Sequence, residues 1–245
     1  MSSVTPVIET RTGWRPATVR EVIRETPSAS TLVLDVPGWP GHRAGQHVDV
    51  RLTAEDGYQA QRSYSVASAP EDAHPAITVE RLDDGEVSPY LVDEAQPGDE
   101  MEIRGPVGGW FVWHVRDGGP LMLVAGGSGL VPLMSMLRHR AHAGSDVEAR
   151  LLLSARRAED VLYAGELRSV DATLTYTRAA PAGWEGYARR VDREMLAEAG
   201  FAPERRPRVF VCGPTGFVEG VAADLVALGH HADRIRTERF GATGG

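Results

Sequence analysis

The segment Arg62-Ser63-Tyr64-Ser65-Val66-Ala67-Ser68-Ala69-Pro70 combines strand-forming residues with three side chains suited to binding a ligand. The guanidinium of Arg62 offers a fixed fork of donors that matches a phosphate. The ring of Tyr64 offers a flat stacking surface, and the Ser65 hydroxyl can donate or accept a hydrogen bond beside it. Because side chains alternate along a strand, Arg62 and Tyr64 face one side and Ser65 the other. One ligand can therefore contact all three only if the strand bends; otherwise the segment is an ordinary edge strand.

The residues around this segment predict an antiparallel domain. Short, roughly alternating runs are separated by turn-forming pairs such as Pro37-Gly38 and Asp56-Gly57. The expected strands are 15–23, 30–36, 46–52, 60–67, 76–82 and 99–104, with a short helix at 89–94. Many short strands with such turns are typical of a small β-barrel or sandwich.

After a linker-like stretch at 116–120, apolar strands alternate with helices. The expected strands are 121–125, 149–153, 172–177, 208–211 and 235–239, and the expected helices are 130–142, 158–169, 193–199 and 217–228. This alternation predicts a parallel sheet covered on both faces, with ligands at the carboxyl ends of its strands. The sequence thus predicts two domains, an antiparallel β-barrel over 1–115 and an α/β, Rossmann-like domain over 116–245.

Composition excludes several classes of function. The 245 residues carry a formal charge of −8, which argues against a nucleic-acid partner. No apolar run reaches the roughly 18–20 residues of a membrane span, and residues 1–20 lack a signal-peptide pattern. We therefore expect a cytoplasmic protein with no membrane partner. Cys212 is the only cysteine, which excludes a disulfide or a four-thiolate iron–sulfur cluster within these residues. His139 and His142 have no third ligand nearby, so they predict a solvated helix face rather than a metal site.

Two glycine turns are candidates for phosphate binding. Gly126-Gly127-Ser128-Gly129-Leu130-Val131-Pro132 joins a predicted strand to a predicted helix, where backbone amides face an anion. Pro132 takes the last place of the usual Gly-x-Gly-x-x-Gly pattern, and a tight packing turn is the alternative. In Gly85-Glu86-Val87-Ser88 the glycine permits close approach of a ligand to the backbone. An ordinary turn capped by Ser88 is the alternative there.

In chain order, these stretches resemble the motifs of the ferredoxin–NADP reductase superfamily. The matching stretches run from residue 44 to residue 240 and are Ala44-Gly45-Gln46, Arg62-Ser63-Tyr64-Ser65, Gly85-Glu86-Val87-Ser88, Gly105-Pro106-Val107-Gly108, Gly127-Ser128-Gly129 with Pro132, Cys212-Gly213-Pro214 and Glu238-Arg239-Phe240. The resemblance implies that the first domain binds FAD, in preference to FMN, and that the second binds NADPH or NADH.

The resemblance also implies roles for individual residues. Those implied to bind the flavin are Arg62, Ser63, Tyr64, Ser65, Gly85, Glu86, Val87, Ser88 and Phe240. Those implied to bind the nicotinamide cofactor are Gly127, Ser128, Gly129, Pro132, Cys212, Gly213 and Pro214. Ser65, Cys212 and Glu238 would line the site of hydride transfer as its catalytic residues, and no metal ligand is expected.

The choice between the two pyridine nucleotides depends on the end of the second strand of the parallel sheet. Ser154, Arg156 and Arg157 lie there, and Arg178 ends the next strand. Their hydroxyl and guanidinium groups suit a 2′-phosphate, and no acidic residue ends the second strand to favour a free ribose. This pattern favours NADPH over NADH; ordinary surface arginines are the alternative.

The resemblance implies a flavoprotein reductase that moves a hydride from NAD(P)H to FAD. A single cysteine leaves no cluster within these residues, so the electrons are expected to leave to a separate acceptor such as a ferredoxin or flavodoxin. Two enzymatic alternatives are a reductase component of an oxygenase complex and a flavin or dye reductase. An alternative of another class is a non-catalytic, nucleotide-sensing binding module. A monomer is expected.

Overall fold

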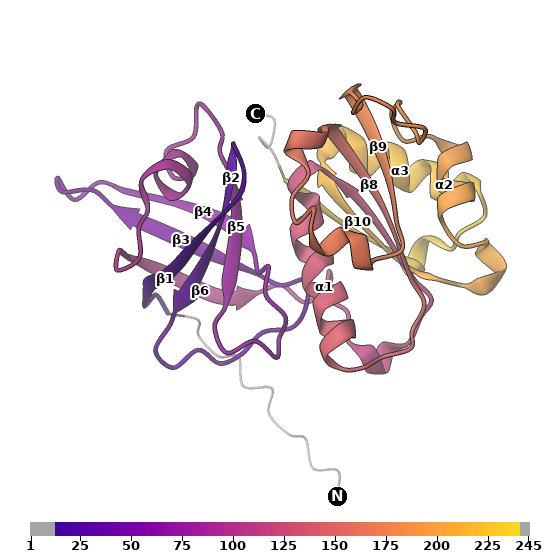
Figure 1. Ribbon diagram of the computed structural model, residues 1–245. Coiled ribbons are helices and arrows are strands. Elements are labelled where there is room, and N and C mark those ends of the chain that lie inside the picture. Colours follow the sequence, from indigo (N-terminus) through magenta and orange to yellow (C-terminus); the bar gives the residue numbers. More distant parts are fainter. Residues whose placement is uncertain (1–12, 241–245) are drawn as a thin grey trace, which may run out of the picture.

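The computed structural model describes residues 13–240, which form two sheets side by side (Figure 1). The N-terminal part is a curled antiparallel sheet, and the C-terminal part is a parallel sheet with helices on both faces. This arrangement confirms the predicted fold class. Within the described residues, no helix is long and apolar enough to cross a membrane.

The antiparallel sheet holds six strands in the order β4-β3-β6-β1-β2-β5. They are β1 (Arg15–Thr26), β2 (Ala29–Asp35), β3 (His47–Thr53), β4 (Gln59–Ser65), β5 (Ala76–Glu80) and β6 (Glu100–Val107). A five-residue π-helical turn, Tyr90–Glu94, covers one end of its core. Strand β4 is an edge strand, so one row of its backbone groups is free to meet a ligand.

The parallel sheet holds five strands in the order β11-β10-β7-β8-β9. They are β7 (Leu121–Gly126), β8 (Ala149–Arg157), β9 (Ala172–Ala179), β10 (Arg208–Pro214) and β11 (Ile235–Phe240). The helices are α1 (Leu130–His142), α2 (Arg193–Ala199) and α3 (Thr215–Ala227). Along β7, Leu121 and Leu123 pack toward α1, whereas Met122 and Val124 pack toward α2 and α3. Burial on both faces explains why this strand is a continuous apolar run.

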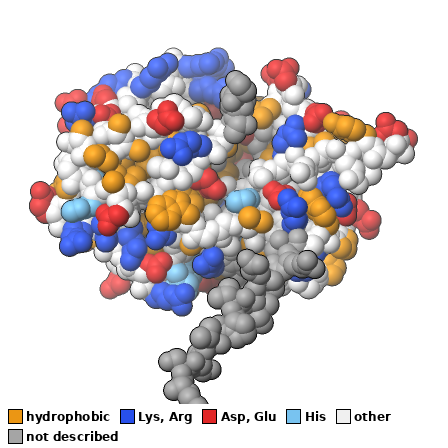
Figure 2. Space-filling model, turned by 180° about the vertical axis from the view of Figure 1, so that it is seen from behind, with side chains coloured by type: hydrophobic (Ala, Val, Ile, Leu, Met, Phe, Trp, Pro, Cys, Tyr) orange, Lys and Arg blue, Asp and Glu red, His pale blue; other side chains and the backbone are white. Residues whose placement is uncertain are grey.

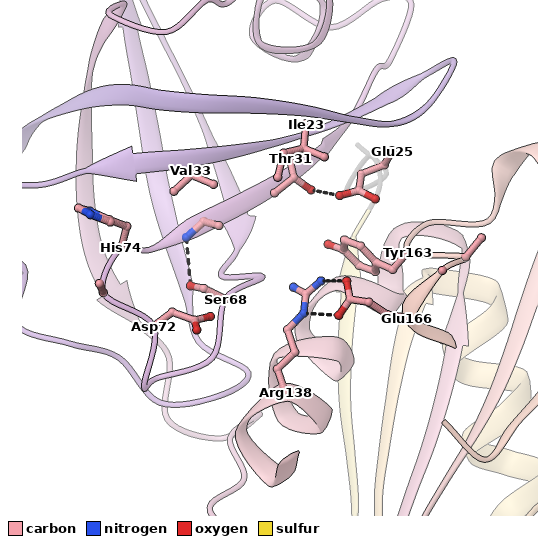
Figure 3. Close-up of a pocket in the computed structure, with 14 residues that line it drawn as sticks. Ile23, Glu25, Thr31, Val33, Ser68, Asp72, His74, Arg138, Tyr163 and Glu166 are labelled. Atoms are coloured by element: carbon pink, nitrogen blue, oxygen red, sulfur yellow. Dashed lines mark hydrogen bonds and ion pairs between the residues drawn. The ribbon is translucent and has the colours of Figure 1, made fainter. Parts of the chain in front are cut away.

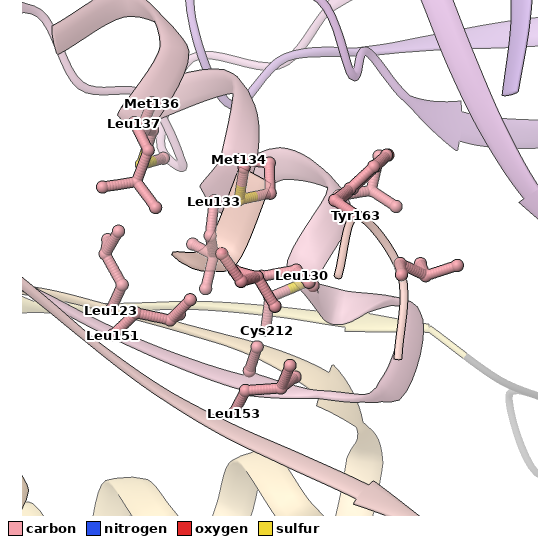
Figure 4. Close-up of a cluster of buried hydrophobic side chains, with 14 of the residues drawn as sticks. Leu123, Leu130, Leu133, Met134, Met136, Leu137, Leu151, Leu153, Tyr163 and Cys212 are labelled. Carbon is pink, nitrogen blue, oxygen red and sulfur yellow. The ribbon is translucent and has the colours of Figure 1, made fainter. Parts of the chain in front are cut away.

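Helix α1 lies between the parallel sheet and the antiparallel domain (Figure 1). The sequence indicates an apolar face at Leu133, Met134 and Leu137, but Val131 and Met136 are buried as well. The α1 side chains meet those of β7, β8 and β10 in one cluster, which also contains Cys212 (Figure 4). The same cluster includes residues of the antiparallel domain, so α1 joins the two domains through an apolar contact.

Two local predictions are wrong. The segment 158–169 is not a helix but two 3-10 turns, Ala158–Asp160 and Glu166–Ser169. Tyr163 between them has φ of 53°, a left-handed conformation that no helix accommodates. His139 does not lie on a solvated face: its side chain is buried, and its Nδ1 lies 2.6 Å from Glu71 Oε1 of the antiparallel domain.

Candidate active site at the domain junction

Strand β4 presents the predicted flavin-binding side chains next to its free edge. It ends at Ser65; the next residue, Val66, forms an isolated bridge with Ile77 of β5, while its backbone N–H still donates to the carbonyl oxygen of Gln46, next to β3. Ser65 is thus the last residue of the β3–β4 ladder, and the contact of Arg62, Tyr64 and Ser65 with one ligand stays a prediction. Tyr64 is half-buried against the core of the antiparallel domain, and burial raises the pKa of its phenol.

Arg62 is paired with an anion. Its Nη2 donates to Glu86 Oε2 at 2.9 Å, and the hydroxyl of Tyr58 donates to Glu86 Oε1 at 2.7 Å. These hydrogen bonds, that of Tyr58 first and that of Arg62 second, lower the pKa of Glu86. The carboxylate of Glu86 thus occupies the guanidinium at which the resemblance predicts a phosphate.

The other predicted residues of this region have structural contacts. The Ser63 hydroxyl donates to Asp49 Oδ1 at 2.6 Å on the opposite side of β4 from Arg62. In the 85–88 turn, Ser88 is buried and its Oγ accepts from the backbone N–H of Leu82 at 3.0 Å. The Ser88 side chain therefore closes the turn, and the side chain that reaches Arg62 from this turn is that of Glu86.

The glycine turn after β7 opens directly into α1. Gly127 has φ of +57°, and a Cβ there would meet nothing within 4 Å, so open space lies beside the turn. Gly129 is the N-cap of α1, and a Cβ there would lie 2.2 Å from the carbonyl oxygen of Cys212. Pro132 is tolerated because it falls in the first turn of the helix, where backbone N–H groups have no helical partner. The start of α1, where backbone N–H groups have no helical partner, thus lies at the carboxyl end of β7.

Cys212 lies at the carboxyl end of β10, against the glycine turn. Its thiol is buried, and burial, followed by the nearby carboxyl of Glu238, raises its pKa well above the usual value. The group is therefore a neutral thiol at physiological pH, and a thiolate nucleophile is not available here. Cys212 therefore takes part in this edge of the sheet through the packing of its side chain and not through the reactivity of its thiol.

Glu238 lies beside Cys212 on the neighbouring strand β11. Its Oε2 is buried and has no hydrogen-bond partner, and burial raises its pKa to about 7. Its Oε1 lies 3.8 Å from Nδ1 of His47, a residue of β3 in the other domain. This distance is too long for a hydrogen bond, so burial is the main influence on the pKa of Glu238. His47 in turn lies opposite Ser65 in the β3–β4 ladder, and burial lowers its pKa.

These contacts bring Ser65, His47, Glu238 and Cys212 into one row across the domain junction. Phe240 ends β11 opposite Pro214, with a half-exposed ring. A half-buried carboxyl with a raised pKa, placed between two domains, is typical of a functional site.

The residues predicted for a 2′-phosphate lie at the same carboxyl edge. Ser154 is adjacent to Gly126 in the β7–β8 ladder. Arg157 pairs with Glu159 at 3.0 Å, and Arg156 lies 3.5 Å from Glu80 of the antiparallel domain. Arg178 is exposed near the end of β9. Two of the three arginines thus contact carboxylates that a phosphate would have to displace.

A cleft of about 640 Å³ opens between the two domains, away from this row. Figure 3 shows its lining, with Arg138 of α1 directed toward Glu166 and the ring of Tyr163 beside them. Tyr163 donates to Thr78 Oγ1 across the junction. None of the predicted site residues lines this cleft. Its polar side chains join the two domains, and we place the candidate active site at the row described above.

The described residues fit a flavin and a nicotinamide nucleotide. The Glu86 carboxylate on Arg62 stands in for a phosphate, and the open side of β4 leaves backbone groups for a ligand. The unpartnered oxygen of Glu238 lacks a donor that a ligand can supply. The open space beside Gly127 leaves room for a pyrophosphate at the start of α1.

Comparison with protein families agrees with this fit. Residues 16–112 match the oxidoreductase FAD-binding domain, and residues 123–223 match the oxidoreductase NAD-binding domain. Together, the fold and these matches define a two-domain oxidoreductase chain with an FAD-binding and an NAD-binding domain. The chain belongs to the ferredoxin–NADP reductase superfamily, whose members combine these two domains.

Named relatives cover almost all of the chain. It is 32% identical over 239 residues to the glycine betaine monooxygenase reductase subunit of Chromohalobacter salexigens, covering 91% of this chain and 63% of that protein. It is 31% identical over 231 residues to the NADH oxidoreductase HCR of Escherichia coli, covering 93% and 68%. The chain therefore spans about two thirds of the length of these relatives.

A solved structure has the same fold. The flavohem-like FAD/NAD-binding domain of nitric oxide dioxygenase from Vibrio cholerae superposes with a TM-score of 0.83 at 26% identity, covering 95% of this chain and all of that one.

Sequence reasoning missed two features of the site. It included Ala44-Gly45-Gln46 among the matching stretches and did not single out the next residue, His47, for the junction. It also did not anticipate that Glu86 pairs with Arg62 and Tyr58. A signal for the second was present, because an acidic residue in a turn that meets an arginine has a strong electrostatic reason to pair with it.

Proposed function

We propose that this chain oxidises NADPH or NADH and passes the electrons through FAD to an acceptor that its 245 residues do not contain. The observation that carries the proposal is the half-buried carboxyl of Glu238, whose buried Oε2 has no hydrogen-bond partner and whose Oε1 lies 3.8 Å from His47 of the other domain. A binding module that only sensed nucleotide would have no use for an uncompensated polar group at this point.

The predicted residues have distinct tasks in this scheme. FAD, when bound, supplies the two-electron centre that accepts a hydride and releases electrons onward. Arg62 holds its pyrophosphate, with Ser63 and the 85–88 turn beside it, and Tyr64 and Phe240 flank its ring. Ser65 lies at the edge of that ring. The proposed boundary between the flavin and nucleotide domains falls between residues 115 and 116.

The nucleotide domain orients the second cofactor. Gly127, Ser128 and Gly129, with Pro132 behind them, present the start of α1 to a pyrophosphate. Cys212, Gly213 and Pro214 border the nicotinamide by shape. Glu238 holds or releases a proton beside them near neutral pH, because its pKa is raised to about 7. One copy of the chain contains both halves of this site, so a monomer suffices.

The acceptor is proposed to be a ferredoxin, a flavodoxin or an oxygenase component. The oxygenase alternative is favoured by the relative named as the reductase subunit of glycine betaine monooxygenase. Turnover of purified ferredoxins, flavodoxins and oxygenase components with NAD(P)H tests this part. Rapid reduction of dyes without turnover of any protein acceptor would instead indicate a flavin or dye reductase.

An absorbance spectrum before and after anaerobic addition of NADPH, and then NADH, tests the central proposal. The expected result is a yellow protein that is bleached by nicotinamide nucleotide. Bleaching at lower concentrations of NADPH than of NADH would support the roles of Ser154, Arg156, Arg157 and Arg178. Equal bleaching by both would leave the reductase proposal intact and remove the 2′-phosphate site. If the protein takes up no flavin, the reductase proposal fails and the non-catalytic, nucleotide-sensing binding module becomes the favoured function.

A further inference from the structure

Tyr58 is an exposed aromatic residue whose side chain is nevertheless fixed. It lies just before β4, next to the turn that joins β3 to β4, and 57% of its surface is exposed. Its hydroxyl donates to Glu86 Oε1 at 2.7 Å, while the other oxygen of the same carboxylate accepts from Arg62. One carboxylate therefore holds the tyrosine next to the guanidinium.

Tyr58, Arg62 and Tyr64 share a face of one extended segment. Their spacing is even-numbered, so their side chains project to the same side. At about 3.3 Å per residue, the backbone of Tyr64 lies about 7 Å from that of Arg62 along the strand, and the backbone of Tyr58 lies about 13 Å away in the opposite direction. The side chains of Tyr58 and Arg62 approach each other on the carboxylate of Glu86. The edge position of β4 leaves one side of this row open. The row offers an aromatic ring, a phosphate-binding cation and a second aromatic ring, in that order.

We infer that Tyr58 is the stacking platform for the adenine of FAD, so that this side chain makes the site selective for a flavin dinucleotide over a flavin mononucleotide. The inference rests on the proposed function, in which Tyr64 contacts the flavin ring and Arg62 the pyrophosphate. A dinucleotide has an aromatic base at each end of its pyrophosphate, and the row of side chains has the same order. A mononucleotide ends at its phosphate and does not reach Tyr58.

The contact with Glu86 makes Tyr58 an effective platform. A side chain already held in one position loses little conformational freedom when a ligand stacks on it. Every nucleobase has a π-face, and stacking on an aromatic side chain needs no further hydrogen bond. When a pyrophosphate displaces Glu86 from Arg62, the carboxylate still accepts from the hydroxyl of Tyr58 and keeps the ring in place.

Equilibrium dialysis tests the inference with the full-length protein, with bound flavin measured by absorbance. Wild type and Tyr58→Leu are each dialysed against a series of FAD and of FMN concentrations. The Kd for FAD should rise about tenfold in Tyr58→Leu, the typical loss when an aromatic platform for one base is removed. The Kd for FMN should not change. Because Tyr58 is exposed, the variant should fold normally, which its circular dichroism and Tm will report.

Two further variants separate the possible causes. Tyr58→Phe keeps the ring and should retain most of the FAD affinity, whereas Arg62→Ala should weaken FAD and FMN alike. Equal loss for both flavins in Tyr58→Leu, or no loss of FAD affinity, would overturn the platform. A wild-type protein that binds FMN as tightly as FAD would overturn it while leaving the proposed function intact. A wild-type protein that binds neither flavin would overturn both.

Discussion

At Glu238, burial and the lack of a hydrogen-bond partner act on a single carboxyl group. Burial raises its pKa from 4.5 to about 7, so the folded protein holds a proton that the unfolded chain has already released. Folding is therefore most favoured by this group below about pH 4.5, and that contribution is lost as the pH rises to about 7. Glu238→Gln has no carboxyl to titrate, so the variant does not lose this stability as the pH rises. The variant should gain up to about 3 kcal/mol over wild type between pH 4.5 and pH 8.

Urea unfolding of the two proteins at a series of pH values, with matched flavin content, measures this difference. Glu55→Gln, in an exposed turn, is the control and should show no such trend. A constant difference between wild type and Glu238→Gln across the pH range would mean that the carboxyl titrates normally.

The thiol of Cys212 should be inert in the folded protein. Burial and the neighbouring Glu238 raise its pKa, so little thiolate is present at pH 8, and the atom is out of reach of a reagent. Iodoacetamide should leave the native protein unmodified and alkylate it fully after unfolding. Because Cys212 is the only cysteine, mass spectrometry of the intact protein gives a direct answer. Rapid alkylation of the native protein would instead indicate a reactive, accessible thiol.

At the scale of elements, Gly129 determines how closely the start of α1 approaches the end of β10. In Gly129→Ala the new Cβ would lie 2.2 Å from the carbonyl oxygen of Cys212, so the backbone must shift. We expect a loss of about 1–3 kcal/mol in stability and weaker binding of NAD(P)H. Gly220→Ala, in the exposed interior of α3, is the matched control. It should instead stabilise the protein by about 0.5–1 kcal/mol.

Denaturant unfolding and nucleotide titration of both variants compare the two glycines. Similar effects of the two substitutions would show that the turn tolerates a side chain and that its close approach has no functional role.

The elements whose signals are local were predictable from the sequence. Strand β7 and helix α1 are found where the apolar runs indicate, because burial on both faces leaves an unbroken pattern. The segment 158–169 was misread because Val161, Leu162 and Tyr163 are buried consecutively. Such a run fits no helical period, and the left-handed Tyr163 follows from tertiary contacts such as its hydrogen bond to Thr78.

The site was predictable only in part, for a related reason. Arg62 and Tyr64 share a strand, so their common face follows from the period of two. The approach of His47 to Glu238 joins residues 191 positions apart on different domains, and no local pattern encodes it. Likewise, the burial of His139 depends on the antiparallel domain covering α1, which its helical period alone does not reveal.

For the whole molecule, Arg138 is a central polar link between the domains. Its Nη1 donates to the backbone oxygen of Ala67 at 2.6 Å, and its other nitrogens bind Glu166. Arg138→Met leaves the Ala67 carbonyl without this donor and should cost about 1.5–3 kcal/mol. Arg193→Met, which breaks an exposed pair with Asp224 within one domain, should cost less than about 1 kcal/mol. Unfolding in urea compares the two, and equal losses would mean that Arg138 stabilises the junction no more than an exposed ion pair stabilises a single domain.

The overall charge should influence which acceptors approach quickly. The chain carries −8, and Figure 2 shows acidic and basic side chains interspersed on one face rather than separated into large patches. A net negative field steers cationic acceptors inward and repels anionic ones, and salt screens both effects. Reduction of a basic cytochrome c should therefore slow as ionic strength rises from about 0.01 M to about 0.15 M. Reduction of ferricyanide should accelerate over the same range.

Stopped-flow rates with each acceptor at several salt concentrations measure the sign of this dependence. A fixed, saturating nucleotide concentration keeps nucleotide binding from contributing to the measured salt dependence. If the rate with each acceptor changes with salt in the opposite direction, electrons leave from a part of the surface whose local positive charge outweighs the net charge. Arg236, which lies over the exposed ring of Trp110, and Arg43 near Gly108 would then be the side chains to neutralise. Because local charges dominate within one Debye length, that result would also mean that the net charge of −8 does not slow the approach of an acidic ferredoxin.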